Sequence, residues 1–400
     1  MKITRVSFWL TSSLILASHA LAAGTAADGY EKCLAANAFS AIDETYTVCT
    51  AALEGKGLQP EKRAKVLSQR ANVFYFAQRL DLAIEDASEA IKLDPGRVEA
   101  YVRRANARIL LGDLHQARED ISLALALNPE HANAYISLGW LYSHTPDDLG
   151  KREPVYLRAL EIEPENGLAL LNMGRIYFYD KRETEKGLAY IERLIAIGPE
   201  KLSRVAYWRN GLDIQSQYDF YAYARIERAS MLRSLARNDQ ALADYDWAIE
   251  KYPDGSRGYL ERGRLRSWNM QDMSGALSDA ERALALYPAA EEPKLLNLSL
   301  LLSLKRTSEA LKMADQIIDG GATHAGRAEA LEVRSRIYKM LNDPERSLSD
   351  IERYLTMMPQ MIPPYQKLLA QRGYYSGDMN GEPSEALRIG LQACIADPDC

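Results

Sequence analysis

The sequence contains four cysteines, two near each end of the chain, whose spacing favours disulfide bonds. Cys33 and Cys49 would lie on the two helices of one N-terminal hairpin, and Cys394 and Cys400 would close a short loop. An even number of cysteines is typical of a disulfide framework in an exported chain, and the leader described below indicates export. We therefore predict the pairs Cys33–Cys49 and Cys394–Cys400, with the two other connectivities and unpaired thiols as alternatives. No Cys-x-x-Cys motif points to a redox enzyme.

No pattern of residues predicts catalysis, a metal site or a cofactor. The histidines that follow the leader lack ligand spacing and lie near predicted turns or exposed helix ends: His115, His131, His144 and His324. The chain also lacks a phosphate-binding loop, a dinucleotide fingerprint and a nucleophile elbow. Neighbouring carboxylates such as Glu291 and Glu292 look like a solvated helix start. We expect no enzyme; an unrecognised envelope enzyme with scattered carboxylates is the alternative.

The N-terminus reads as a cleavable signal peptide. Lys2 and Arg5 precede an apolar run at 8–21, and Ala20 and Ala22 occupy the two small-residue positions before Ala23. An uncleaved anchor is the alternative, although the run is short for a bilayer span. No other stretch of the sequence is apolar enough to span a bilayer. Loss of residues 1–22 removes two positive charges and takes the net charge from −6 to −8 (−6 − 2). Such an acidic chain is a poor candidate for nucleic-acid binding, which needs a basic footprint.

A repeat of about 34 residues organises the chain. Prolines that end helical runs recur at this interval or at twice it, with one wider gap: Pro95, Pro129, Pro164, Pro199, Pro253, Pro288 and Pro359. Six of them follow a small or medium apolar residue by five positions: Ala90, Ala124, Ala159, Leu194, Ala248 and Ala283. Small residues also recur where two helices would cross: Ala71, Ala105, Gly139, Gly174, Ala229 and Gly263 on first helices, and Ala83, Ala117, Ala241, Ala276 and Ala310 on second helices. This pattern predicts stacked helix hairpins, each stopped by its proline.

These residues resemble the tetratricopeptide repeat, whose 34-residue unit carries an aromatic residue or Leu, then Leu-Gly, Tyr, Ala, Ala and Pro at fixed places. Tyr135, Leu138, Gly139, Tyr142, Ala159 and Pro164 match it in one unit. Full units would begin near Ala64, Val98, Ala132, Gly167, Ala222, Ser256, Glu291 and Ala328. The resemblance implies an all-α, right-handed superhelical solenoid of helix-turn-helix repeats.

The resemblance also implies that positions two, five, six, nine and twelve of each unit face a concave groove. The partner-binding candidates at these positions are Asn72, Tyr75, Arg103, Asn106, Trp140, Asn172, Arg175, Phe178 and Arg264. Arg233 falls at such a position too, and Tyr179 and Trp268 lie beside them. Amides could pair with a peptide main chain, guanidinium groups with a carboxylate, and rings with apolar side chains. Any single residue of this set could equally be an ordinary solvated side chain. The carboxylate-clamp specificity is not implied, because Ser68 stands where that subfamily has lysine.

An arginine recurs at position seven, one residue before the small residue: Arg70, Arg104, Arg228, Arg262 and Arg334. We predict a structural role for it, since the repetition follows the fold and not a single site.

The C-terminal segment is similar to part of a small peptidoglycan-binding domain. Its core is matched by Gln366, Leu369, Gly373, Tyr374, Tyr375, Gly377, Asn380 and Gly381, with Asn replacing the family's Asp. The Gly-Pro-x-Thr element that should follow is missing. Tyr374, Tyr375 and Asn380 are therefore possible wall-binding residues, and a solenoid cap is the alternative.

The sequence thus predicts an exported, non-enzymatic scaffold that binds a protein or peptide, in the periplasm of a Gram-negative bacterium. A cell-wall factor anchored to peptidoglycan is the second hypothesis. The predicted segments are a signal peptide (1–22), a degenerate capping hairpin (23–63), four repeats (64–200), an aromatic-rich insertion (201–221), four further repeats (222–361) and a C-terminal helical cap (362–400).

Overall fold

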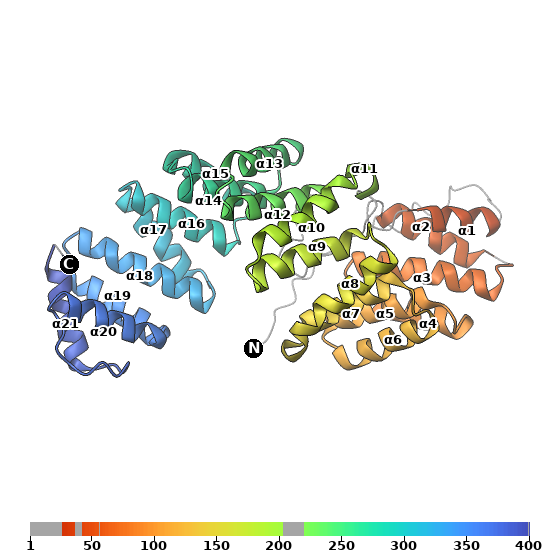
Figure 1. Cartoon of the computed structure of the whole chain (residues 1–400), viewed down its shortest axis with the longest axis horizontal. Coiled ribbons are helices and arrows are strands. Elements are labelled where there is room, and N and C mark those ends of the chain that lie inside the picture. The colour runs from red at the N-terminus through yellow and green to blue at the C-terminus, as the bar shows by residue number, and fades with distance from the viewer. Residues whose placement is uncertain (1–25, 37–41, 56, 203–219, 399) are drawn as a thin grey trace. The chain divides into compact units, whose positions relative to one another are not determined.

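The computed structural model describes residues 26–36, 42–55, 57–202, 220–398 and 400. All regular secondary structure in these ranges is helical, and the helices follow one another as stacked hairpins (Figure 1). The prediction of an all-α repeat solenoid is therefore confirmed. Most of the predicted insertion, residues 203–219, lies outside the described ranges. Within those ranges, no helix is long and apolar enough to cross a membrane.

The described residues form two compact units, and η3 (Ile176–Asp180) spans the boundary between them. Unit 1 contains α1 (Ala26–Ala35), α2 (Ile42–Glu54), α3 (Pro60–Phe76), α4 (Leu80–Leu93), α5 (Val98–Leu111), α6 (Leu114–Leu127), α7 (Ala132–Ser143), the short 3₁₀ helix η2 (Pro146–Lys151), α8 (Arg152–Ile162), α9 (Gly167–Arg175) and α11 (Pro199–Leu202). Unit 2 contains α10 (Thr184–Ala196), α12 (Phe220–Ser234), α13 (Asn238–Lys251), α14 (Ser256–Trp268), α15 (Met273–Leu286), α16 (Glu291–Ser303), α17 (Thr307–Asp319), α18 (His324–Met340), α19 (Pro344–Met357), η4 (Pro359–Met361), α20 (Ile362–Gln371) and α21 (Glu385–Ala396).

The repeat boundaries agree closely with the periodicity of the sequence. Five predicted unit starts coincide with the first residue of a helix: Val98, Ala132, Gly167, Ser256 and Glu291. The alanines predicted at helix crossings are fully buried: Ala71, Ala83, Ala105, Ala117, Ala229, Ala241, Ala276 and Ala310. Helices can approach this closely because no larger side chain separates their backbones.

Gly139 shows how tight one crossing is. A Cβ built at this position would lie 2.4 Å from Cζ of Tyr156, whose ring is almost completely buried. Tyr156 thus fills the space that a side chain on α7 would need.

We expect Gly139→Ala to lower the free energy of unfolding by about 1–3 kcal/mol, because the ring can move only by disturbing its packed neighbours. Urea unfolding followed by circular dichroism measures this change. Gly150→Ala is the matched control, since a Cβ at Gly150 would meet no atom within 4 Å. An unchanged midpoint for Gly139→Ala would show that the crossing tolerates a methyl group.

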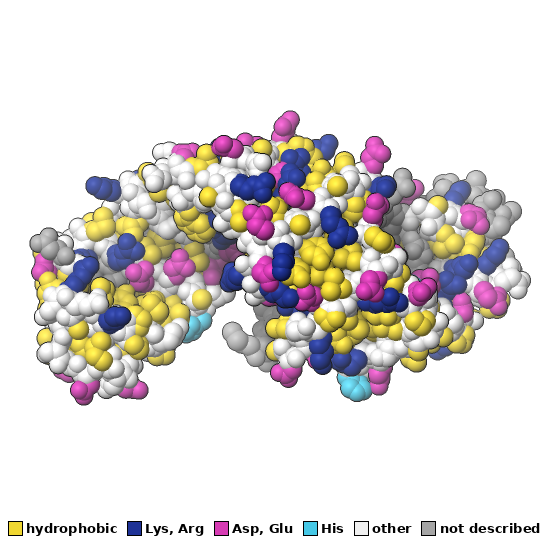
Figure 2. Space-filling model, in the orientation of Figure 1, with side chains coloured by type: hydrophobic (Ala, Val, Ile, Leu, Met, Phe, Trp, Pro, Cys, Tyr) yellow, Lys and Arg dark blue, Asp and Glu magenta, His cyan; other side chains and the backbone are white. Residues whose placement is uncertain are grey.

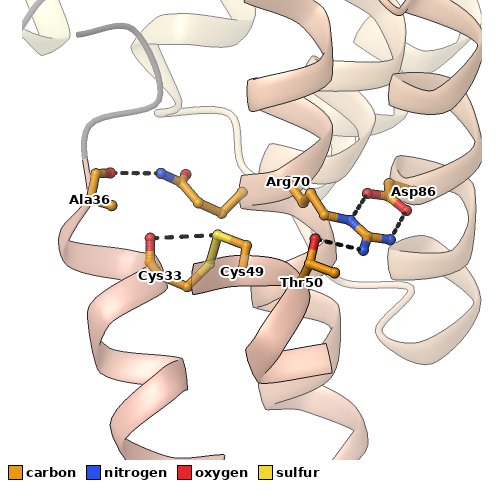
Figure 3. Close-up of a disulfide and its surroundings, with 7 residues drawn as sticks. Cys33, Ala36, Cys49, Thr50, Arg70 and Asp86 are labelled. Carbon is orange, nitrogen blue, oxygen red and sulfur yellow. Dashed lines mark hydrogen bonds and ion pairs between the residues drawn. A yellow bond between two sulfur atoms is a disulfide. The ribbon is translucent and has the colours of Figure 1, made fainter. Parts of the chain in front are cut away.

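The position-seven arginines form the same contact in five hairpins. Each guanidinium donates two hydrogen bonds of 2.6–3.0 Å to an aspartate on the second helix of its own hairpin: Arg70 to Asp86, Arg104 to Asp120, Arg228 to Asp244, Arg262 to Asp279 and Arg334 to Asp350. Several also reach the preceding hairpin, as Arg70 does to Thr50 and Arg262 to Asp246. The predicted structural role is therefore confirmed, and these pairs connect hairpins as well as helices (Figure 3).

Both predicted disulfides are present in the structure. Cys33–Cys49 joins α1 to α2 with a Cα–Cα distance of 4.7 Å, and Cys394–Cys400 closes the loop after α21 with a Cα–Cα distance of 5.2 Å. Beside the first disulfide, Gln69 donates a hydrogen bond to the carbonyl of Ala36 and ties α3 to the end of α1 (Figure 3).

Candidate functional site

In unit 1 the first helices of three successive hairpins lie side by side, with α5 packed against both α3 and α7. This arrangement brings together five of the predicted groove residues: Asn72 and Tyr75 on α3, Arg103 and Asn106 on α5, and Trp140 on α7. The rings of Tyr75 and Trp140 meet edge to face with centroids 6.5 Å apart. We call these five residues the unit 1 groove cluster.

Arg103 has an unusual environment within this cluster. Its side chain is half-buried, yet it forms no hydrogen bond and no ion pair with any residue that the structure describes. Burial lowers the pKa of its guanidinium, and the nearby Tyr75 and Glu99 offset this only in part. A desolvated cation without a carboxylate partner destabilises the folded chain. An anionic ligand would relieve this penalty.

The side-chain oxygens of the two asparagines in the cluster also have no hydrogen-bond donor among the described residues. Asn72 is only 6% exposed, and neither its Oδ1 nor that of Asn106 accepts a hydrogen bond from any part of the chain that the structure describes. A buried amide without a partner is uncommon in folded proteins. Carboxamide groups can both donate hydrogen bonds to a peptide backbone and accept them from it, so the two side chains could pair with the main chain of a bound peptide.

The aromatic residues supply the apolar part of the cluster. Trp140 is half-buried and also contacts the ring of His144, at 5.5 Å between centroids. Tyr75 is 7% exposed, and desolvation raises the pKa of its hydroxyl well above the usual range. The cluster therefore combines one unpaired cation, two amides and two rings.

The remaining predicted residues of unit 1 lie on α9. Asn172 donates from Nδ2 to the carbonyl of Leu168 at 2.8 Å, so its amide is engaged within its own helix. Arg175 is half-buried on the last turn of α9. Neither shares the environment of Arg103.

In unit 2 the corresponding charges are paired within the protein. Arg264 donates to Glu261 at 2.7 Å and to Glu292 at 3.0 Å, and it is therefore not a free cation for a ligand. Glu261 also pairs with Arg233, which stacks on the exposed Trp268 ring. Phe178 lies in η3 against the ring of Tyr179.

Unit 2 also contains a buried ion pair that the sequence pattern did not indicate. Glu227 is fully buried and accepts hydrogen bonds from Tyr223 at 2.5 Å and from Arg257 at 2.9 Å. Glu227 and Glu261 both occupy position six of their units, the position that Arg103 occupies in its own. A comparison of the charge of the position-six residue in successive units would have distinguished the first helices of unit 1 from those of unit 2.

The C-terminal motif residues form a closed hydrogen-bond network around Gln366, which is fully buried between α20 and the following loop. Its Nε2 lies within hydrogen-bond distance of the hydroxyl of Tyr375 and Oδ1 of Asn380, and its Oε1 accepts from the backbone of Gly381. Tyr375 is itself buried, and the hydroxyl of Tyr374 donates to Asp397. The three residues proposed to bind peptidoglycan thus make internal contacts that hold this loop.

Figure 2 shows one face of the molecule, on which positively charged, negatively charged and apolar side chains are intermixed. Among the described residues, no group of three or more His, Cys, Asp or Glu side chains could hold a metal ion.

Comparison with known proteins finds a family match for one repeat unit. Residues 98–131, which contain α5 and α6, match the tetratricopeptide repeat family model. A curated relative is the tetratricopeptide repeat and J domain-containing co-chaperone DNJ1 of Fusarium oxysporum f. sp. lycopersici, which is 27% identical over 188 residues. The match covers 43% of this chain and 33% of the relative.

Solved structures share the fold. A chain in the crystal structure of the APC/C hetero-tetramer Cut9-Hcn1 superimposes with a TM-score of 0.56 at 12% identity, and the match covers 91% of this chain and 61% of that one. At this identity the likeness concerns the fold alone. The chain therefore spans about a third of the curated relative and less than two thirds of that structural neighbour.

Proposed function

We propose that this chain, a tetratricopeptide-repeat protein, is a non-enzymatic adaptor that holds a segment of a partner protein on the unit 1 groove cluster. The observation that carries the proposal is Arg103, a half-buried guanidinium without a hydrogen bond or ion pair to the described residues. Folding alone gives no reason to keep this charge, because an apolar side chain of similar volume would avoid the desolvation penalty. A ligand that bears a carboxylate gives such a reason.

The chemistry of the cluster favours a peptide. Arg103 would bind an acidic side chain or a terminal carboxylate, Asn72 and Asn106 would bind main-chain amides, and the rings of Tyr75 and Trp140 would cover an apolar side chain. The matched co-chaperone, which is itself named as a tetratricopeptide repeat protein, supports a role in contacts between proteins.

We also propose that the protein is exported to the periplasm of a Gram-negative bacterium. The leader at 1–22 and the two disulfides support this location, because disulfides persist in oxidising compartments. N-terminal sequencing of the protein from fractionated cells tests it, with a mature chain that begins at Ala23 as the expected result.

Substitution of Arg103 tests the adaptor proposal. We expect Arg103→Met to lose the partner when the oxidised protein is purified from its own cell envelope and analysed by mass spectrometry. A central arginine contact is worth about 2 kcal/mol or more at an interface, which corresponds to at least about a thirtyfold loss of affinity. Thermal unfolding of the same variant should show equal or greater stability, because an unpaired cation has been removed.

The matched control is Arg346→Met on α19 of unit 2, where the arginine side chain is 69% exposed. This variant should retain the partner. Equal recovery of the partner with Arg103→Met would exclude the unit 1 groove cluster as the binding site. If the wild-type protein recovers no protein partner, the cell-wall hypothesis gains support, and sedimentation with purified sacculi tests it directly.

A further inference from the structure

A second surface of distinct chemistry lies in unit 2, where α16 packs beside α18. An open pocket of about 560 Å³ is lined by these two helices, by the turn after α16 and by the last cysteine. Its lining residues are Ser299, Leu302, Ser303, Lys305, Val333, Arg336, Lys339, Met340 and Cys400. We call it the α16–α18 pocket.

The pocket is cationic although the chain as a whole is acidic, with a net charge of −6. Three of its lining residues are Lys or Arg, and none is Asp or Glu. The side chain of Lys305 is exposed, and its ammonium group forms no ion pair or hydrogen bond with the described residues, whereas its backbone N–H and carbonyl bond to Leu302 and Thr307. Arg336 approaches a carboxylate only at 3.9 Å, from Glu332 one turn earlier on α18, which is longer than a hydrogen bond. Both cations therefore keep their donors available.

Apolar side chains line the same pocket. Val333 is buried at 6% exposure, Leu302 is half-buried, and Met340 is 55% exposed. An exposed methionine beside two aliphatic side chains offers an adaptable apolar surface next to the cations. A free inorganic anion would leave this surface unused, whereas a peptide with an acidic residue beside an apolar one would use both parts.

The C-terminal disulfide loop forms one wall of the pocket. Cys400 lines it, and Lys339 donates from Nζ to the carbonyl of Cys394 at 3.0 Å, which ties the loop to α18. Because the Cys394–Cys400 bond fixes Cys400 relative to α21, the disulfide holds this wall in place.

We propose that the α16–α18 pocket binds a partner peptide through an acidic side chain held by Lys305 and Arg336, with a neighbouring apolar side chain on Leu302, Val333 and Met340. The Cys394–Cys400 disulfide is required because it positions the wall. This site is separate from the unit 1 groove cluster and does not depend on ligand binding there.

Fluorescence anisotropy with the fluorescein-labelled peptide Gly-Leu-Glu-Leu-Glu-Leu and the full-length oxidised protein tests the proposal. We expect saturable binding that weakens at high salt, and at least about tenfold weaker binding when both glutamates of the peptide are replaced by glutamine. The double variant Lys305→Asn/Arg336→Gln should lose affinity by a similar factor. Asparagine suits position 305 because Lys305 has a φ of 58°, which Asn tolerates.

The charge-matched control is Lys312→Gln/Arg346→Gln, which removes two exposed cations from α17 and α19. It should bind like wild type, and so should Arg103→Met. Absence of saturable binding, or an equal loss in the control, would overturn the site. Cys400→Ser should also weaken binding; unchanged affinity in that variant would refute the role of the disulfide wall.

Discussion

Replacement of Asp244 by alanine is expected to lower the free energy of unfolding by about 3 kcal/mol. Asp244 has a side chain that is only 1% exposed, and it accepts hydrogen bonds from both Arg228 and Arg225. Its loss would leave two guanidinium groups, at 25% and 18% exposure, without their shared carboxylate. Breaking a buried ion pair on one side costs more than the pair contributes, because the remaining charge stays desolvated.

Urea unfolding followed by circular dichroism measures the effect, with hydrogen exchange to locate it in α12 and α13. The control is Glu89→Ala, which removes an ion pair with Lys92 whose partners are 49% and 74% exposed. Exposed pairs contribute little, so this variant should unfold like wild type. The double variant Arg228→Met/Asp244→Leu should recover part of the loss, since it removes charge on both sides. If Asp244→Ala unfolds at the same urea concentration as the wild type, water replaces the carboxylate in the variant.

Removal of the Cys33–Cys49 disulfide is expected to cost about 3 kcal/mol in the N-terminal hairpin, because its loop spans 16 residues and closure restricts the unfolded chain. Cys33→Ser/Cys49→Ser is compared with the oxidised wild type by thermal unfolding and by hydrogen exchange of α1 and α2. Both sulfur atoms are fully buried beside α3, so protection of α3 should fall as well.

The control for this prediction is the shorter Cys394–Cys400 loop, which spans 6 residues and should stabilise less by the same reasoning. If reduction of the protein leaves both the melting temperature and the exchange of α1 and α2 unchanged, the Cys33–Cys49 bond contributes no stability.

The repeat architecture could be predicted from the sequence because it rests on local rules. Proline stops a helix wherever it occurs in its interior, and a small residue is needed wherever two helices cross closely. Ala71, Ala105 and Ala229 were placed at crossings from spacing alone, and all three are fully buried. The structural role of the position-seven arginine followed from its repetition in the same way.

The partners of those arginines could not be read from the sequence with the same ease. Asp86 and Asp244 lie 16 residues after their arginines, on the facing helix, among many other carboxylates of the same helices. The packing of the two helices brings this aspartate, and not its neighbours on the same helix, to the guanidinium group. The same is true of Gly139, whose requirement for a missing side chain comes from Tyr156 on the next helix.

The candidate site also depends partly on the sequence and partly on the tertiary structure. The resemblance to the repeat implied that Arg103 and Arg264 both face the groove formed by the first helices, and it treated them as equal candidates. The tertiary structure separates them, because Glu292 from the neighbouring hairpin and Glu261 form ion pairs with Arg264, while no described carboxylate forms an ion pair with Arg103 and the nearby Glu99 offsets its burial only in part. The sequence thus determined the order and spacing of the helices, and the resemblance assigned each candidate side chain to a face of the repeat. Which charge stays unpaired depends on contacts between helices far apart in the chain, and these exist only in the folded protein.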